Sequence, residues 1–166
     1  MTRQRLVAAV VSGGQTGVDR AALEAARATG TPYRGWCPRG GLAEDHPQPP
    51  GVLAAWPGLR ETPDDDPADR TTRNVDDSDA VLVLRLDPTA CSPGTDLTVT
   101  VARRRGRPWL EAWADEVERV ATWLVEVAGR QGSPVVLDVA GPRESEDPGV
   151  HAATLPSLVS LVGRPG

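Results

Sequence analysis

The sequence contains no Lys, no Ile and no Phe, and all 18 of its basic residues are Arg. Without Lys, the protein cannot form a lysine Schiff base, hold pyridoxal phosphate through a lysine, or use a phosphate-binding loop that ends in Gly-Lys-Ser/Thr. The formal net charge of -5 argues against a general nucleic-acid-binding surface. Any anion site must therefore be made by local Arg.

Cysteine and histidine are scarce, with two of each. Cys37 and Cys91 cannot form a disulfide framework or a four-thiolate zinc site, and their spacing to His46 and His151 matches no zinc motif. We therefore expect no metal site. The apolar run near the N-terminus is too short for a signal peptide or a membrane span, so we expect a cytoplasmic protein without membrane or nucleic-acid partners.

The length of 166 residues fits one domain, and we expect a single domain over residues 1–166. Gly and Pro, 17 and 16 residues, have no collagen-like period and indicate a compact domain rich in loops. Trp is present five times, and Trp109 and Trp113 fall on one side of their segment whether it is a strand or a helix. Because Trp is enriched in interface cores, we expect a homo-oligomer.

Apolar runs alternate with amphipathic stretches along the chain. The apolar runs predict strands at residues 6–11, 80–86 and 134–140, and a short strand is also expected at residues 33–36. Apolar residues at helical spacing predict helices at residues 18–29, 95–105 and 114–128. Helices are also expected at residues 69–79 and 149–162, the last interrupted by Pro156. Residues 109–113 fit either a strand or a helix. The alternation predicts an α/β fold, a three-layer sandwich with a mostly parallel sheet and helices on both faces.

Residues 37–69 carry many of the Pro and Gly residues and are predicted to be a lid, a binding loop or a disordered segment. Cys37 in this segment is either a nucleophile or, as is more common, a small buried side chain. Glu44 and Asp45 are either acid/base or site residues, or solvated acids.

Three strand-end loops are rich in Gly, Ser and Thr: residues 12–17 (SGGQTG), 92–95 (SPGT) and 141–145 (GPRES). The carboxyl ends of parallel strands meet at one edge of a sheet, where ligands bind. Glycines let the backbone approach an anion closely, and the N-terminus of the following helix attracts it. Taken singly, these loops could be a tight turn, an ordinary helix cap and a loop with a solvated Arg.

Several Arg residues lie near these loops in the sequence: Arg20, Arg39, Arg70, Arg73 and Arg143. Together with the loops they predict a site for a phosphorylated or otherwise anionic ligand. We expect about half of them to be partners of acids such as Asp19, Glu44, Asp45 or Asp79 instead.

Five segments carry a resemblance to a known family: SGGQTGVDRAALEAA, GWCPRGGLAED, RTTRNVDDSDAVLVL, GTDLT and VAGPRESEDPGV. In this order they resemble the molybdenum carrier proteins, the molybdenum-cofactor-carrier-like family, over residues 6 to about 162. That family is similar to the lysine-decarboxylase-like, or Lonely-guy-like, Rossmann-type proteins, many of which bind nucleotides. The resemblance implies a Rossmann-like fold that binds the phosphate-bearing pterin of molybdenum cofactor, for carriage or storage, with cofactor-synthesis or acceptor enzymes as partners.

Residue by residue, the match covers the first loop, Gly13 to Gly17, and Gly94 and Thr95 of the second, where Pro93 replaces a Gly and removes one amide donor. Phosphoribohydrolases of the Lonely-guy type carry a Glu four residues after the matching Gly, and this chain has Thr98 there. Thr cannot act as a carboxylate base, so binding is favoured over catalysis. The alternative is a nucleotide-binding or nucleotide-hydrolysing protein of the same fold group.

The candidate ligand-binding residues are Ser12, Gly13, Gly14, Gln15, Thr16, Gly17, Arg20, Pro38, Arg39, Gly40, Glu44, Arg73, Asn74, Ser92, Gly94, Thr95, Gly141, Pro142 and Arg143.

Overall fold

One six-stranded sheet forms the centre of the protein, whose computed structural model describes residues 5–166. Its strands are β1 (Val7–Val11), β2 (Tyr33–Cys37), β3 (Leu59–Glu61), β4 (Ala80–Arg85), β5 (Trp109–Trp113) and β6 (Val135–Ala140). They pair in the order β3-β2-β1-β6-β4-β5, and every pair is parallel. The parallel α/β sheet predicted from the sequence is therefore confirmed.

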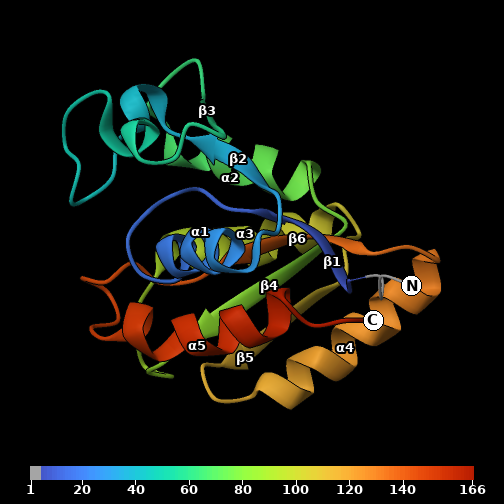
Figure 1. The fold of residues 1–166 in the computed structure, drawn as a ribbon. Coiled ribbons are helices and arrows are strands. Elements are labelled where there is room, and N and C mark those ends of the chain that lie inside the picture. The colour runs from blue at the N-terminus through green and yellow to red at the C-terminus, as the bar shows by residue number, and fades with distance from the viewer. Residues whose placement is uncertain (1–4) are drawn as a thin grey trace.

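Helices cover both faces of the sheet (Figure 1). The helices of one face are α1 (Val18–Thr29), α4 (Val117–Gln131) and α5 (Val150–Val162), and those of the other are α2 (Pro67–Asp76) and α3 (Pro93–Arg104). This is the Rossmann-like three-layer layout that was expected. No helix within residues 5–166 combines the length and the apolar character that crossing a membrane requires.

The inner strand β4, between β6 and β5, is buried on both faces, which explains its continuous apolar run. Leu82 and Leu84 pack in the core under α1, α4 and α5, whereas Val81 and Val83 pack against α2 and α3. The same alternation holds in β6, where Leu137 and Val139 belong to the first core. Asp138 lies between them and therefore faces the α2 and α3 side, close to the carboxyl end of its strand.

The segment 37–69, predicted to lack regular structure, is ordered. It contains two short turns, η1 (Arg39–Gly41) and η2 (Gly51–Ala54), and the edge strand β3. A small second core anchors it, because Val52, Trp56 and Leu59 pack with Leu23 and Cys37. The short β3 sequence Leu-Arg-Glu has no apolar alternation, so only its pairing with β2 identifies it as a strand.

Burial settles the alternatives for Cys37, whose thiol donates to the Arg60 carbonyl oxygen at 3.4 Å. Burial also raises the pKa of this thiol, which disfavours the thiolate that a nucleophile needs. Cys37 is therefore a small core side chain.

The ambiguous residues 109–113 form strand β5, in register with β4 from Val81 beside Trp109 to Arg85 beside Trp113. Helix α4 consequently begins at Val117, three residues after the predicted start. Helices α2 and α3 each begin two residues earlier than predicted, at Pro67 and Pro93, because proline is favoured in the first helical turn. Helix α5 continues through Pro156, where an interruption was expected.

Two strand-end loops touch directly at Gly17. This residue has a φ of 75°, and a Cβ atom there would lie 2.2 Å from the Pro142 carbonyl oxygen and 2.9 Å from the Arg143 Cα. The next amide, of Val18, donates to the same Pro142 oxygen at 3.3 Å. Glycine at position 17 therefore lets the β1–α1 and β6–α5 loops meet.

We predict that Gly17→Ala lowers the free energy of unfolding by about 2 kcal/mol or more, because it adds both a clash and a strained φ. Gly129→Ala is the matched control, since Gly129 lies within α4 with no atom within 4 Å of its added Cβ. That change should stabilise the protein by about 0.5–1 kcal/mol. Urea denaturation measures both, and a Gly17→Ala variant as stable as the wild type would contradict the loop contact.

Candidate functional site

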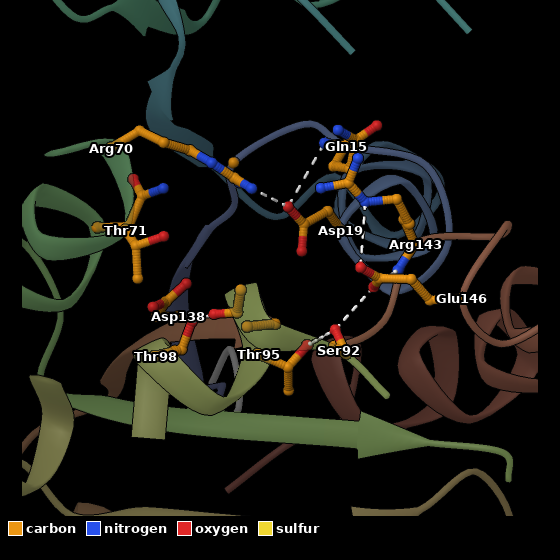
Figure 2. A pocket seen from close by; sticks show the side chains of 15 residues that line it. Gln15, Asp19, Arg70, Thr71, Ser92, Thr95, Thr98, Asp138, Arg143 and Glu146 are labelled. Carbon is orange, nitrogen blue, oxygen red and sulfur yellow. Dashed lines mark hydrogen bonds and ion pairs between the residues drawn. The ribbon is translucent and has the colours of Figure 1, made fainter. Parts of the chain in front are cut away.

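A pocket lies beyond the carboxyl ends of β1 and β6, where the strand order changes direction along the sheet. Its walls come from the β1–α1 loop, helices α2 and α3, and the β6–α5 loop (Figure 2). The lining residues are Gly13, Gln15, Asp19, Arg70, Thr71, Asn74, Ser92, Gly94, Thr95, Thr98, Asp138, Ala140, Gly141, Arg143 and Glu146.

The three loops singled out in the sequence meet at this pocket. Eight candidate residues line it: Gly13, Gln15, Asn74, Ser92, Gly94, Thr95, Gly141 and Arg143. Asn74 is held there by its amide group, which accepts from the Trp36 amide at 2.7 Å and donates to the Trp36 carbonyl at 3.1 Å. Sequence reasoning missed Asp19, Thr71, Asp138 and Glu146 as pocket residues, and it did not commit Arg70 and Thr98 to the site.

The N-terminus of α3 brings free amide donors into the pocket wall. Pro93 occupies the first helical position, where its missing amide costs nothing, and the amides of Gly94 and Thr95 have no hydrogen-bond acceptor among the described residues. The hydroxyls of Ser92 and Thr95 lie 2.7 Å apart beside them. This end of the pocket therefore has the donors and the helix dipole that attract an anion.

Glu146 holds several of the donors that an anion would use. Its Oε2 accepts from the Ser92 hydroxyl at 2.7 Å and from the Arg143 amide at 3.1 Å, and its Oε1 lies 3.4 Å from the Arg143 guanidinium. Figure 2 shows the Glu146 carboxylate between these two residues. The chain thus supplies a negative group of its own at this end of the pocket.

An ion pair between Arg70 and Asp19 lies across the first glycine of the β1–α1 loop. The Arg70 Nη1 is 3.1 Å from the Asp19 Oδ2, and a Cβ atom on Gly13 would fall 1.7 Å from that nitrogen. Asp19 also accepts from the Gln15 amide at 3.4 Å. Burial raises the pKa of Asp19 above its ordinary value, although the Arg70 charge opposes the rise.

Asp138 presents a carboxyl group that has no partner. Its residue is 3% exposed, and its side chain makes no hydrogen bond or ion pair within residues 5–166. Burial raises the pKa of Asp138 well above its ordinary value, the Asp19 charge adds to the rise, and Arg70 opposes it. Asp138 therefore keeps its proton to higher pH than an exposed aspartate does.

Other candidate residues support the site from outside the pocket lining. Ser12 is buried, and its hydroxyl donates to the Asp19 carbonyl at 2.8 Å. Gly14, with a φ of 75°, faces Leu59 and Val52 of the second core. Gly17 and Pro142 form the contact between the two loops.

Arg20 and Arg39 were expected to lie beside Arg143, and both lie elsewhere. Arg20 donates to the Gly14 carbonyl and pairs with both oxygens of Asp45, so its guanidinium is already ion-paired within the protein. Arg39 reaches the Pro63 carbonyl at 3.4 Å on the protein surface.

Three further candidates also make contacts outside the pocket. Arg73 pairs with Asp69 at 2.9 Å and covers the Trp36 ring, and Pro38 precedes the turn in which the Gly40 amide donates to Glu61 at 2.7 Å.

Glu44 connects its own segment, residues 37–69, to the β1–α1 loop and to the β6–α5 loop. Its carboxylate accepts from the Thr16 hydroxyl, from the Ser145 amide at 3.2 Å and from the Ser145 hydroxyl. Partial burial acts to raise the pKa of Glu44, but the hydrogen bonds from Ser145 and Thr16 outweigh it and lower that pKa. Glu44 is thus an ionised carboxylate that holds these loops together by accepting their hydrogen bonds. Within residues 5–166, no three His, Cys, Asp or Glu side chains come together in a way that could hold a metal ion.

The fold and the pocket define a Rossmann-like protein with a polar pocket at the switch point of a parallel sheet. The chain belongs to the circularly permutated YpsA SLOG family, whose model matches residues 10–162. A crystal structure from Syntrophus aciditrophicus SB, described as "Putative molybdenum carrier protein", is similar, with 34% identity, a TM-score of 0.80 and 96% of each chain covered. The family resemblance drawn from the sequence is therefore confirmed. No protein with a curated description matches the chain.

We predict that Asp138→Asn stabilises the protein at about pH 7 and that this gain disappears as the pH falls to about 4. The pKa of Asp138 in the folded state lies above the ordinary value of 3.8, which applies to the unfolded chain. At pH values between these two pKa values, the folded protein therefore holds a proton that the unfolded chain has lost. Wild-type stability therefore falls as the pH rises through this window. A tenfold difference in proton affinity corresponds to about 1.4 kcal/mol.

Urea denaturation at several pH values measures this difference. Asp65→Asn is the control, because Asp65 is exposed and makes no side-chain hydrogen bond or ion pair with any described residue. A stability difference for Asp138→Asn that stays constant with pH would mean that Asp138 titrates alike in both states.

Proposed function

We propose that this protein binds a phosphate-bearing anionic ligand in the pocket at the carboxyl edge of the sheet, and that the ligand is molybdenum cofactor, held for storage or transfer. The observation that carries the proposal is the pair of free amides of Gly94 and Thr95 at the start of α3. The family membership and the similarity to a protein described as a molybdenum carrier support the choice of ligand.

The α3 end of the pocket suits the phosphate. Backbone amides and a helix N-terminus bind phosphate without a lysine, which this chain lacks. Arg143 adds a guanidinium that can donate two parallel hydrogen bonds, and Ser92 adds a hydroxyl. A phosphate at this position would take the donors that Glu146 holds, so binding requires the Glu146 carboxylate to move away.

The cavity is too small for such a ligand unless this movement occurs. It measures about 40 Å³, which is room for about three water molecules. Pockets that hold a ligand ring usually measure roughly 300 Å³ or more. Arg143 and Glu146 lie on a loop, with side chains 37% and 21% exposed, and their displacement would open the pocket.

A carrier must also meet other proteins, and we propose that enzymes that make or receive the cofactor are its partners. A second copy of the chain is a further proposed partner. Trp113 on the edge strand β5 lines a surface groove with Leu86, Pro88 and Ala153, and Leu86 is 43% exposed. Trp109, on the same strand, is covered by the Arg103 guanidinium. The groove at Trp113 is therefore the proposed contact.

Nucleotide binding or hydrolysis is a second candidate function. Thr98 lines the pocket, and its hydroxyl donates to the Gly94 carbonyl at 3.0 Å, so it supplies no carboxylate. Asp138 in the same pocket does carry a carboxyl group, and this group is the observation that favours nucleotide hydrolysis as a second candidate function. Release of free base from AMP or GMP, followed by chromatography, would identify such an enzyme.

We predict that Arg143→Ala weakens binding of molybdenum cofactor by about 2 kcal/mol, or roughly thirtyfold, through loss of a charged hydrogen bond. Binding to the wild type should also weaken as salt rises. Cofactor released from a purified molybdoenzyme is titrated with the protein, and the bound pterin is quantified by fluorescence after oxidation.

Arg73→Ala is the matched control, because Arg73 pairs with Asp69 outside the pocket lining. It should leave the affinity unchanged. Equal affinities for the two variants would remove Arg143 from the site, and absence of binding to the wild type would overturn the proposed ligand.

We predict that the wild-type chain forms a closed oligomer at micromolar concentration and that Trp113→Arg converts it to a monomer of 17.6 kDa. A charged side chain in the groove would oppose its burial between two copies. Light scattering after gel filtration measures the mass, and Val125→Arg, at an exposed position of the helix α4, is the control. A wild-type monomer would refute the interface, and an oligomer indifferent to Trp113→Arg would exclude this groove.

A further inference from the structure

Asp138 lies apart from the proposed phosphate position. Figure 2 shows the Asp138 carboxyl beside Thr98, on the side of the pocket opposite Arg143 and Glu146. Both Thr98 and Thr95 belong to α3, one turn apart, so the pocket follows this helix from its free amides towards Asp138. A ligand with its phosphate on those amides would direct its other end at Asp138.

No charged group within residues 5–166 pairs with Asp138. Asp19 on α1 raises the pKa of Asp138 by its negative charge, and Arg70 on α2, whose charge lowers that pKa, donates to Asp19 instead. Helix α3 lines the pocket with Gly94, Thr95 and Thr98, none of which is charged, and the Thr98 hydroxyl donates to the Gly94 carbonyl. On the β6–α5 loop, Arg143 and Glu146 pair with each other.

A buried carboxyl without hydrogen bonds is unfavourable, and a bound ligand can supply them. In its protonated form the group offers one O–H donor and one carbonyl acceptor side by side. An amino-substituted nitrogen heterocycle offers the complement, a ring nitrogen that accepts and a neighbouring amino group that donates. Two hydrogen bonds then form at once, as in recognition of a base edge.

We propose that Asp138, as a neutral carboxylic acid, recognises the N=C–NH₂ edge of the ligand's heterocycle while the α3 amides hold its phosphate. This inference rests on the proposed function and names the ligand class: a phosphorylated amino-substituted ring. Pterins, guanine and adenine all carry such an edge. The partnerless carboxyl at 3% exposure and the free amides are two independent observations at the two ends of one pocket.

The test compares two substitutions of Asp138. Asp138→Asn keeps one donor and one acceptor in the same shape. Asp138→Leu removes both and puts an apolar side chain of similar size in their place. The probes are a pterin monophosphate, GMP, AMP and IMP, with inorganic pyrophosphate as a ligand without a ring, and calorimetry gives each affinity. IMP has no exocyclic amino group and serves as the matched ligand control.

We expect Asp138→Leu to weaken binding of at least one amino-substituted probe roughly tenfold to a hundredfold, while its affinities for IMP and pyrophosphate stay within about threefold of the wild type. Unchanged binding of those two ligands also shows that the variant folds. The pattern among pterin, guanine and adenine identifies the ring. Asp138→Asn should bind all probes within about threefold of the wild type.

The pH dependence provides a second readout. Wild-type affinity for the amino-substituted probe should fall once the pH passes the pKa of Asp138, and the affinity of Asp138→Asn should not. Stronger binding at higher pH, or loss of binding in Asp138→Asn, would overturn the proposal in favour of an ionised carboxylate. Binding that requires Mg²⁺ and disappears in Asp138→Asn would overturn it in favour of a cation bridge.

Failure of this inference is distinguishable from failure of the proposed function. If Asp138→Leu binds every probe as the wild type does, the ring contact is refuted and the phosphate site stands. If the wild type binds neither pyrophosphate nor any phosphorylated probe, the proposed anion site itself is refuted, and the inference fails with it.

Discussion

The contact between the β1–α1 loop and the β6–α5 loop is the constraint on which the pocket depends. It is made at Gly17, where a Cβ atom would collide with the Pro142 carbonyl, and it is reinforced by Thr16, which accepts from the Glu144 amide at 3.1 Å. Strands β1 and β6 are neighbours in the sheet, so their following loops must cross the same edge. The pocket lies beside these two loops and is closed by residues of α2 and α3.

Charge in the pocket is balanced by the chain itself. Arg70 pairs with Asp19 and Arg143 pairs with Glu146, so neither arginine stands as a free cation. An acidic protein that binds anions through Arg alone would have to break such pairs. Backbone amides at the start of α3 have no partner to lose, although a phosphate bound there would still displace Glu146 from Ser92 and Arg143. The helix terminus, rather than the net charge, therefore makes an anion site physically reasonable here.

The segment 37–69 is fastened to the site. Arg20 joins Gly14 to Asp45, and Glu44 joins Thr16 to Ser145, so the segment and two strand-end loops form one hydrogen-bonded rim. The second core around Trp56 holds the rest of the segment on β2 and α1. Several residues that resembled ligand contacts in the sequence act in this rim as structural supports.

The local pattern of the sequence predicted strands β1, β2, β4 and β6, the alternation of strands with helices, and the three Gly-rich loops. These features depend on residues close together in the chain, such as the apolar run of β4 buried on both faces. Strand β3 was not predicted, because a short edge strand without apolar alternation is identified only by its pairing with β2. The starts of α2 and α3 at Pro67 and Pro93 were missed although proline in the first helical turn is a local signal.

The sequence by itself determined that phosphate-binding loops of the lysine type are impossible and that Gly, Ser and Thr gather at the strand ends. Only the tertiary structure decided which charges face one another. Asp138 stands in an apolar strand whose pattern does not reveal which layer it faces, and Glu146 meets Ser92 across 54 residues of chain. Burial and partner distance set the proton affinity and the use of such groups, and both arise only when the layers pack.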